Sequence, residues 1–326
     1  QLERPRVSIC EVPITLRGVE GNATPNVVSN KIYAIPNRLS QIYDAAKLMV
    51  KDYFRKIGAS KAVIGASGGI DSALCAAIAM SALGKENVHL IMMPSGYSSE
   101  GSKTDAVELA GNLGVTHEII PISMILDSYR MQFSTTSIGS IGETLTEENL
   151  QARIRANILM AYSNANPGTL VLTTGNKSEI LTGYSTLYGD SVGAFCVLRD
   201  ILKTDVYALA NWINAEVKWY AIPQSTIEKA PSAELGPDQK DTDSLPPYKA
   251  LDPLLEMLVD KHMTSEEVIC SGFCESYSIT PDQVREIANK VKRSEFKRQQ
   301  GVLGVKVTPV AVGGDRRMPV VNGYQM

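Results

Sequence analysis

The residues best suited to chemistry form a turn of small side chains, Ser67–Ser72, with the sequence Ser-Gly-Gly-Ile-Asp-Ser. The apolar run 61–66 before it and the run 73–80 after it predict a buried strand, a turn and a buried helix. The backbone N–H groups of such a turn face an anion at the helix N-terminus, and its glycines let phosphate oxygens approach closely. Asp71 can hold the Mg2+ that neutralises those phosphates. The simpler alternative is a tight turn in which Ser67 caps the helix.

A second polar segment, Thr173–Glu179, follows another short apolar run, 170–172. Both segments are therefore expected beyond the carboxyl ends of strands, at the same edge of one parallel sheet. A threonine, a glycine and an acid at that edge can contact adenine or ribose and supply a second metal ligand. The alternative is a second capped helix, with Asn176 or Ser178 as the cap and Glu179 favouring the helix dipole.

The first turn lacks the lysine of a Walker A loop, G-x-x-x-x-G-K-[ST]. It resembles instead the pyrophosphate loop, S-G-G-x-D-S, of the N-type ATP pyrophosphatases. Members of that superfamily cleave ATP between the α and β phosphates and activate a carboxylate or carbonyl as an adenylate. The loop alone leaves the substrate open, because asparagine, argininosuccinate, GMP and NAD synthetases and tRNA-thiolating enzymes share it.

Further segments resemble the NAD+ synthetase family, particularly the synthetase part of its glutamine-dependent members, over roughly residues 38–326. These segments are Asn149–Arg155, Gly183–Asp190, Lys203–Tyr207, Lys229–Leu235, Glu295–Gln300, Gly304–Val307 and Asp315–Pro319. The resemblance implies a ligase that converts nicotinic acid adenine dinucleotide (deamido-NAD), ATP and ammonia to NAD+, AMP and pyrophosphate through an acyl adenylate. It also implies the Rossmann-like fold of the adenine nucleotide alpha-hydrolases.

The resemblance assigns roles to individual residues. Asp71 and Glu179 would bind Mg2+, and Asp71 and Lys203 would be catalytic, with Lys203 stabilising charge on the reacting phosphoryl group. The expected ATP-binding residues are Gly65, Ala66, Ser67, Gly68, Gly69, Ile70, Asp71, Ser72, Thr174, Lys203 and Ser232. The expected deamido-NAD-binding residues are Asn149, Arg153, Glu179, Tyr184, Ser185, Thr186, Leu187 and Lys297.

Some of these positions have other readings or depart from part of the family. Lys203 can instead be a solvated lysine at a helix start, and Arg153, like Arg155, a solvated helix arginine. The short, ammonia-dependent members have a lysine in place of Leu187 and a histidine in place of Phe296. Both differences fit the glutamine-dependent branch.

Hydrophobic periodicity predicts the elements that position these residues. A helix is expected over 37–57, and strands are expected at 61–66, 87–93, 116–122 and 169–174. Helices are expected at 70–83, 99–113, 123–132, 146–165, 176–183 and 204–218. This alternation predicts an α/β fold, a doubly wound parallel sheet with helices on both faces.

The second half of the chain is expected to be less regular. Residues 184–202 are predicted to be a loop, and residues 224–249 a long mobile loop that closes over ATP and excludes water. Helices near 250–260, 264–272 and 280–293 are predicted to form a small C-terminal helical annex, followed by an irregular tail.

Length and composition allow one large α/β domain or one domain with appendages. The resemblance implies a synthetase domain at 37–326, whose annex and tail occupy 250–326, after a linker or lead-in at 1–36. The net charge of −3 predicts no nucleic-acid partner, and no apolar run approaches the ~20 residues of a membrane span. Five cysteines, an odd number, favour a reducing, cytoplasmic location. Cys270 and Cys274 are expected to be buried thiols on helices rather than zinc ligands.

The resemblance also predicts partners. Glutamine-dependent members carry a nitrilase-like glutaminase domain before the synthetase region, and residues 1–36 are too short to be one. The chain starts at Gln1 without a methionine, so it is expected to be a fragment whose glutaminase lies upstream or is encoded separately. The alternative is an enzyme that takes free ammonia. A homodimer or higher oligomer is expected, with the helix around 150–165 near the contact, because the family binds its dinucleotide across a dimer interface.

Two other functions remain open. One is another N-type ATP pyrophosphatase, such as a GMP synthetase or a tRNA-thiolation enzyme. The other is a non-catalytic adenine-nucleotide sensor, which needs the glycines of the turn but not both Asp71 and Glu179 as metal ligands.

Overall fold

A computed structural model of the chain describes residues 37–216, 221–232, 234–236, 241, 244–316 and 318–320. Residues Asn37–Met326 form one compact unit. The predicted lead-in at 1–36 lies outside the described residues, and the fold described below is that of the compact unit.

Five parallel strands form one sheet in the order β3-β2-β1-β4-β5, which confirms the predicted doubly wound architecture. The strands are β1 (Lys61–Gly65), β2 (Val88–Met92), β3 (Thr116–Ile119), β4 (Thr169–Thr173) and β5 (Phe195–Cys196). β1 is central, because Ala62 pairs with Val88 on one side and with Leu170 on the other. The strand order therefore reverses between β1 and β4, and the turns that follow these two strands lie at that switch point.

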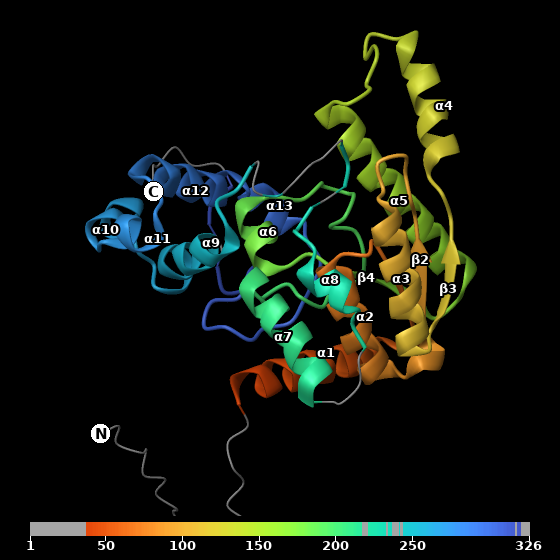
Figure 1. The fold of residues 1–326 in the computed structure, drawn as a ribbon, viewed down its shortest axis with the longest axis horizontal. Coiled ribbons are helices and arrows are strands. Elements are labelled where there is room, and N and C mark those ends of the chain that lie inside the picture. Colours follow the sequence, from red (N-terminus) through yellow and green to blue (C-terminus); the bar gives the residue numbers. More distant parts are fainter. Residues whose placement is uncertain are drawn as a thin grey trace, which may run out of the picture. The chain divides into compact units, whose positions relative to one another are not determined.

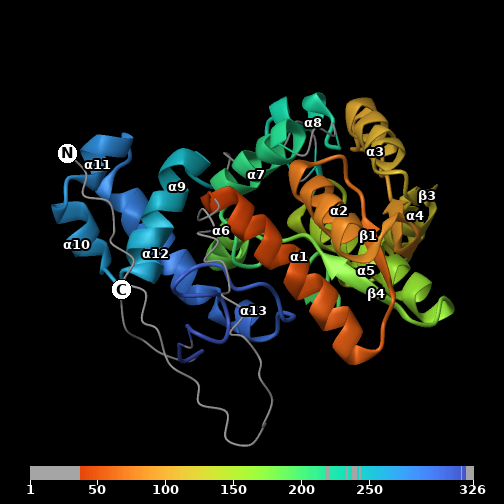
Figure 2. The same ribbon diagram turned by 90° about the horizontal axis from the view of Figure 1, so that it is seen from below.

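Helices cover both faces of the sheet (Figures 1 and 2). One face carries α1 (Arg38–Ile57), α2 (Ile70–Leu83), α3 (Glu100–Leu113), α7 (Lys203–Glu216) and α8 (Gln224–Glu228). The other face carries α4 (Ser123–Ser134) and α5 (Leu145–Ala165). Alternate residues of β1 point into different layers, since Ile64 belongs to the first core and Val63 to the second.

A helical annex lies on the side of the domain away from α4 (Figures 1 and 2). It contains α9 (Tyr248–Leu255), which runs into a π-helical turn (Glu256–Asp260), then α10 (Ser265–Cys270), α11 (Phe273–Tyr277) and α12 (Pro281–Arg293). Its core includes Leu251, Val284 and Ile287, and also Leu181 from α6 (Lys177–Thr182). The annex thus braces α6, the short helix that follows β4.

The structure corrects several predictions in the second half of the chain. The loop predicted at 184–202 contains β5, and the loop predicted at 224–249 contains α8 and the start of α9. The tail, predicted to be irregular, contains α13 (Glu295–Gln299) and isolated bridges such as Cys196 to Gly304. These pieces have between two and five residues, too few to show a hydrophobic period.

Smaller differences concern boundaries and thiols. β3 ends at Ile119, earlier than the predicted 122, and the predicted end of α7 at 217–218 lies outside the described residues. Cys274 is buried as predicted, but Cys270 is exposed, because it lies on the solvent side of the short helix α10.

Within the part of the chain that the structure describes, no helix is both long and apolar enough to cross a membrane.

Candidate active site

A cavity of about 310 Å³ lies at the carboxyl ends of β1 and β4. It is lined by the turn after β1, the turn after β4, the start of α7 and part of the 229–235 segment. Ten of the eleven predicted ATP-binding residues line it: Gly65, Ala66, Ser67, Gly69, Ile70, Asp71, Ser72, Thr174, Lys203 and Ser232. The structure therefore brings together residues from distant parts of the sequence, as the parallel topology predicts.

The remaining residue, Gly68, does not line the cavity and instead packs against α3. Its φ is +78°, and a Cβ there would lie 2.2 Å from the backbone oxygen of Ser102 on α3. Gly69, and not Ser67, is the N-cap residue of α2, and it makes no side-chain capping bond. The alternative that Ser67 is merely a cap is therefore wrong. The Ser67 hydroxyl accepts a bond from the N–H of Gly69 at 3.2 Å, and the Ser72 hydroxyl donates to the Gly69 carbonyl at 2.9 Å.

Lys203 connects the two acids predicted to bind metal. Its Nζ lies 2.5 Å from Oδ2 of Asp71 and 3.2 Å from Oε1 of Glu179. The residue is 3% exposed, which excludes the alternative of a solvated lysine at a helix start. Burial alone favours the neutral amine, but the carboxylates outweigh it and raise the pKa of Lys203. Burial raises the pKa of Glu179, although the ammonium of Lys203 favours its ionised form.

The turn after β4 both caps α6 and serves the site. Asn176 and Glu179 form a capping box, in which the Asn176 side chain accepts from the N–H of Glu179 at 3.0 Å. The amide nitrogen of Asn176 also donates to Oδ1 of Asp71 at 2.9 Å. The segment is therefore a capped helix start, as the alternative expected, and it also contacts Asp71, while its role in ligand or metal binding stays a prediction.

Ser178 and Asp252 set the position of Lys203. The Ser178 hydroxyl donates to Oδ1 of Asp252 at 2.6 Å and accepts from the backbone N–H of Lys203 at 3.0 Å. The other oxygen of Asp252 accepts from the N–H of Thr204 at 2.7 Å, at the first turn of α7. Because Ser178 and Asp252 are buried, the start of α7 is held rigidly against the turn that carries Glu179.

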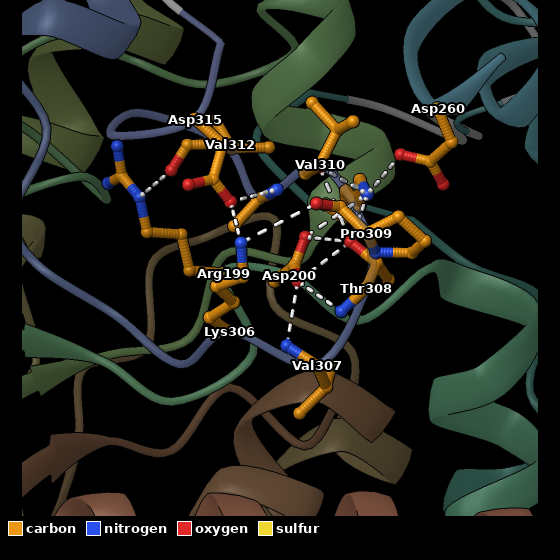
Figure 3. Close-up of polar contacts among 12 residues, drawn as sticks. Arg199, Asp200, Asp260, Lys306, Val307, Thr308, Pro309, Val310, Val312 and Asp315 are labelled. Carbon is orange, nitrogen blue, oxygen red and sulfur yellow. Dashed lines mark hydrogen bonds and ion pairs between the residues drawn. The ribbon is translucent and has the colours of Figure 1, made fainter.

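Lys177 anchors the C-terminal tail beneath the same turn. Its buried Nζ lies 3.1 Å from Oδ1 of Asp200 and from Oδ1 of Asp260, and donates to the Thr308 hydroxyl at 2.7 Å. Asp200 in turn accepts from the backbone N–H groups of Val307 at 2.8 Å and Thr308 at 2.7 Å (Figure 3). The tail is therefore part of the packing that supports Asn176–Glu179.

The donor set of Asp71 and Glu179 fits Mg2+. Carboxylate oxygens are hard ligands, and protein sites for Mg2+ commonly use one or two carboxylates while substrate phosphates and water supply the rest. No group of three or more His, Cys, Asp or Glu residues that could hold a metal ion is found among the described residues. The geometry thus suits a cation shared with a polyphosphate rather than one enclosed by protein alone.

The predicted deamido-NAD residues fall into two groups. Glu179 and Tyr184 line the main cavity, and Ser185 and Lys297 line a smaller one of about 40 Å³ that shares Glu179. Lys297 donates to the carbonyl oxygens of Gly183 at 2.8 Å and Ser185 at 2.7 Å.

The other four predicted residues contact one another. The Thr186 hydroxyl donates to Oδ1 of Asn149 at 2.7 Å, and Nε of Arg153 donates to the Leu187 carbonyl at 3.3 Å. None of these four lines either cavity as the described residues form them. Arg153 is exposed, so its assignment stays a prediction.

Sequence reasoning missed Arg155 as a cavity residue. Arg155 lines the main cavity, and its Nε donates to the Met93 carbonyl at 3.0 Å. Burial lowers the pKa of this guanidinium to about 10. Helical spacing offered a signal, because Ala152, Ala156 and Leu159, which also line the cavity, share its face of α5, whereas Arg153 points elsewhere.

The segment 229–235 contributes more than Ser232. Lys229 donates to Oδ2 of Asp105 at 2.6 Å, and Oε1 of Glu234 accepts from the hydroxyls of Ser99 at 2.9 Å and Ser102 at 2.6 Å. These bonds tie the segment to α3, beside the turn after β1. Asp241, another missed residue, lines the cavity and accepts from the Tyr248 hydroxyl at 2.8 Å.

Comparison with known proteins gives consistent matches. A sequence model described as NAD synthase matches residues 42–301. The glutamine-dependent NAD(+) synthetase of Thermotoga maritima is 45% identical over 291 residues, which are 89% of this chain and 49% of that protein. The chain thus spans about half the length of the curated relatives it matches.

Solved structures agree. The glutamine-dependent NAD+ synthetase of Acinetobacter baumannii, in complex with adenosine diphosphate, is 38% identical with a TM-score of 0.57, over 90% of this chain and 52% of that one. The NH3-dependent NAD synthetase of Campylobacter jejuni, in complex with a nitrate ion, is 28% identical with a TM-score of 0.59. That match covers 81% of this chain and 96% of the other.

Proposed function

This chain belongs to the NAD synthase family, and from that membership we propose that it amidates deamido-NAD to NAD+ at the expense of ATP. The observation that carries the proposal is the junction of Asp71, Glu179 and Lys203 at the turn after β1, inside a cavity of about 310 Å³. A different N-type pyrophosphatase, such as a GMP synthetase or a tRNA-thiolation enzyme, is not favoured, because the NAD synthase model matches residues 42–301, which include the helical annex.

Two successive substitutions account for the reaction. An oxygen of the pyridine carboxylate attacks the α-phosphorus of ATP, and the bond from that phosphorus to the bridging oxygen breaks, releasing pyrophosphate. The nitrogen of ammonia then attacks the carbonyl carbon of the adenylate, and AMP leaves with the electron pair of the carbon–oxygen bond. The attacking nitrogen, which carries three protons, gives one of them to solvent or to a basic group and keeps two in the amide. No oxidant or reductant is required.

The main demand on the protein is electrostatic, since a carboxylate must approach a polyphosphate. We propose that the backbone N–H groups of residues 67–70 hold the pyrophosphate at the N-terminus of α2. The ammonium of Lys203 then offsets charge on the phosphoryl group under attack. Mg2+ held by Asp71 and Glu179 would neutralise phosphate oxygens and increase the electrophilicity of phosphorus. Thr174 and Ser232, which line the same cavity, would contact the nucleotide.

Some of the expected deamido-NAD residues line the two cavities, Glu179 and Tyr184 the main one and Ser185 and Lys297 the smaller one. We propose that deamido-NAD lies along these cavities, with Asn149, Arg153, Thr186 and Leu187 at its far end. A planar guanidinium such as that of Arg153 suits a dinucleotide phosphate.

The segment 224–249 is proposed to close over ATP and to keep water from the adenylate, since Lys229 and Glu234 already tie part of it to α3.

Partners follow from the relatives. The curated relatives are about twice as long as this chain and are named glutamine-dependent, so we propose that a glutaminase domain supplies the ammonia. A homodimer with α5 near the contact and a cytoplasmic location complete the proposal. The homodimer rests on the family resemblance, and the cytoplasmic location rests on the cysteine content.

One assay tests the function. The chain is incubated with ATP, Mg2+, deamido-NAD and ammonium, and NAD+, AMP and pyrophosphate are measured. We expect the three products in equal amounts with ammonium, and none when glutamine replaces it. Absence of AMP under every condition contradicts the enzyme proposal, and ATP binding without pyrophosphate release identifies a nucleotide sensor instead.

A further inference from the structure

Lys203 occupies the space between the two carboxylates proposed to bind Mg2+. Its Nζ lies 2.5 Å from Oδ2 of Asp71 and 3.2 Å from Oε1 of Glu179. It also lies 5.3 Å from the ring centre of Tyr248, whose face attracts a cation. The ammonium is thus enclosed by anionic and aromatic groups that suit any small cation.

The remaining oxygens of the two carboxylates are engaged by one residue, Asn176. Its side-chain amide donates to Oδ1 of Asp71 at 2.9 Å, and its backbone N–H donates to Oε2 of Glu179 at 3.4 Å. A cation that bridges the pair must therefore share oxygens that already accept hydrogen bonds from Lys203 or Asn176.

The ammonium and a divalent ion compete for those oxygens. Mg2+ binds carboxylate oxygens at about 2.1 Å, and two cations at such a separation from the same atoms repel strongly in a site withdrawn from water. Lys203 is buried, so solvent does little to screen that repulsion.

The other basic side chains that line the cavity, among the described residues, are engaged elsewhere. Lys229 donates to Asp105 at 2.6 Å, Arg155 to the Met93 carbonyl at 3.0 Å and Lys103 to Glu100 at 2.7 Å. Lys203 is therefore the side chain that neutralises Asp71 and Glu179.

We propose that Lys203 and the divalent cation exclude one another from the Asp71–Glu179 pair, so that the cation enters together with ATP and not before it. The triphosphate provides the counter-charge that draws the ammonium of Lys203 away from the carboxylates. One movement then opens the metal position and brings Lys203 to the phosphates. This inference rests on the proposed function, because it takes Asp71 and Glu179 as the metal ligands.

Direct metal binding tests the exclusion without turnover. Mn2+ substitutes for Mg2+, and free Mn2+ is measured by electron paramagnetic resonance in the absence of nucleotide. We expect Lys203→Met and Lys203→Gln to bind Mn2+ at least about tenfold more tightly than the wild type, because each removes the competing charge. The glutamine variant keeps a hydrogen-bond donor for the carboxylates, so it guards against failure of the methionine variant to fold.

Lys103→Met is the matched control, because it removes a lysine that lines the same cavity and is paired with the exposed Glu100 and not with the metal ligands. It should leave Mn2+ affinity unchanged. Equal Mn2+ affinity in the wild type and both Lys203 variants overturns the proposal.

The wild type provides an independent check. Mn2+ alone should leave its unfolding temperature unchanged, whereas Mn2+ with α,β-methylene-ATP should raise it more than the analogue alone. A rise with Mn2+ alone, as large as that with both, contradicts the exclusion. Turnover of the wild type is measured separately, so a failure to make NAD+ overturns the proposed function and leaves the Mn2+ comparison intact.

Discussion

Consecutive side chains at the start of α6 carry out different tasks. Asn176 orients Asp71, Lys177 holds the tail, Ser178 supports the first turn of α7 through Asp252, and Glu179 faces Lys203. This division is possible because neighbours on a helix point about 100° apart, so each reaches a different segment. The electrostatics of the site therefore depend on a short stretch that contributes little to the apolar core.

Replacing Asp71 by asparagine should stop the reaction while leaving the fold intact. The substitution removes the charge that holds a divalent cation, but its amide oxygen can still accept the bond from Asn176. Several kcal/mol of charge stabilisation are lost, so NAD+ and AMP formation should fall at least about hundredfold. Initial rates at saturating Mg2+ measure this, with circular dichroism to verify folding.

Asp52→Asn is the control for that experiment. Asp52 is an acid on α1 paired with Arg55 and Lys56, so its neutralisation should leave the rates unchanged. Full activity of Asp71→Asn would remove Asp71 from the proposed metal site.

That the expected ATP-binding residues lie around one cavity could be predicted from sequence, because they belong to contiguous motifs at the ends of strands. Asp252 and Glu234 could not, because their roles depend on contacts with Ser178 and Ser102, which are 74 and 132 residues away in the chain. Such pairings are fixed by the packing of the annex and of the 229–235 segment. Arg155 and Arg153 lie in the same motif, and the two differ in the face of α5 on which they lie. Only Arg155 lines the main cavity.

The turn between β1 and α2 needs glycine at one position for steric reasons. Gly68→Ala places a Cβ 2.2 Å from the Ser102 carbonyl in a backbone conformation with φ of +78°. Either α3 or the turn must move, so we expect a loss of about 1–3 kcal/mol in unfolding free energy and weaker ATP binding. Urea denaturation and nucleotide titration measure the two effects.

Gly96→Ala is its matched control, since an added Cβ there meets no atom within 4 Å. Its stability and ATP affinity should equal those of the wild type. If Gly68→Ala behaves like Gly96→Ala, the close approach to α3 is not essential.

An ion pair joins α4 to α5 and predicts a pH dependence. The buried carboxylate of Glu147 accepts from Nε of Arg130 at 2.8 Å and from the Tyr97 hydroxyl at 3.0 Å. The Arg130 bond lowers the pKa of Glu147 below its usual value of 4.5, despite the opposing effect of burial. A carboxyl whose pKa is lowered on folding stabilises the protein above its unfolded pKa, and the stabilisation is lost as pH falls through the folded pKa.

Glu147→Gln should therefore destabilise the protein by about 1–3 kcal/mol at neutral pH. The difference from the wild type should shrink as the pH falls below 4.5, where the wild-type carboxyl also becomes protonated. Urea unfolding at a series of pH values measures this. A difference that stays constant across the acidic range would show that the ion pair is not its source.

Elements of at least twelve residues were predictable because they span several hydrophobic periods, as α1, α2, α3, α4, α5, α7 and α12 do. The helices α8 and α13 were not, because five residues make little more than one helical turn, and β5 was not, because it has two residues. The bridge of Cys196 to Gly304 places the tail beside β5, a long-range pairing that local patterns do not encode.

The domain as a unit was predictable in class, since alternating strands and helices leave few topologies besides a doubly wound parallel sheet. The joining of tail, annex and sheet was not, because it depends on buried polar groups. Lys177 and Asp200 are buried there and form an ion pair. The Thr308 hydroxyl hydrogen-bonds to both of them. In a low-dielectric interior such a network is stable only when all its members are satisfied.

Thr308→Val should test the anchor of the tail. Valine preserves the shape of threonine but removes the hydroxyl that accepts from Lys177 at 2.7 Å and donates to Asp200 at 2.7 Å. Two buried charges lose a partner, so unfolding free energy should fall by about 1–3 kcal/mol. Urea denaturation measures it.

Thr104→Val on α3 is the comparison, because its exposed hydroxyl bonds only to the Glu100 carbonyl of its own helix. Its effect should stay within about 0.5 kcal/mol. Equal stability of the two variants would show that the tail is held by its backbone bonds alone.

The bond between Lys177 and Thr308 also has a consequence for folding during translation. Thr308 lies 131 residues downstream of Lys177, and a chain emerges from the ribosome from its N-terminus onward. A nascent chain that has reached β4 and α6 therefore carries Asp71 and Glu179 before the oxygens that enclose Lys177 exist. The contact of Lys177 with Thr308 can therefore form only after the tail has been translated.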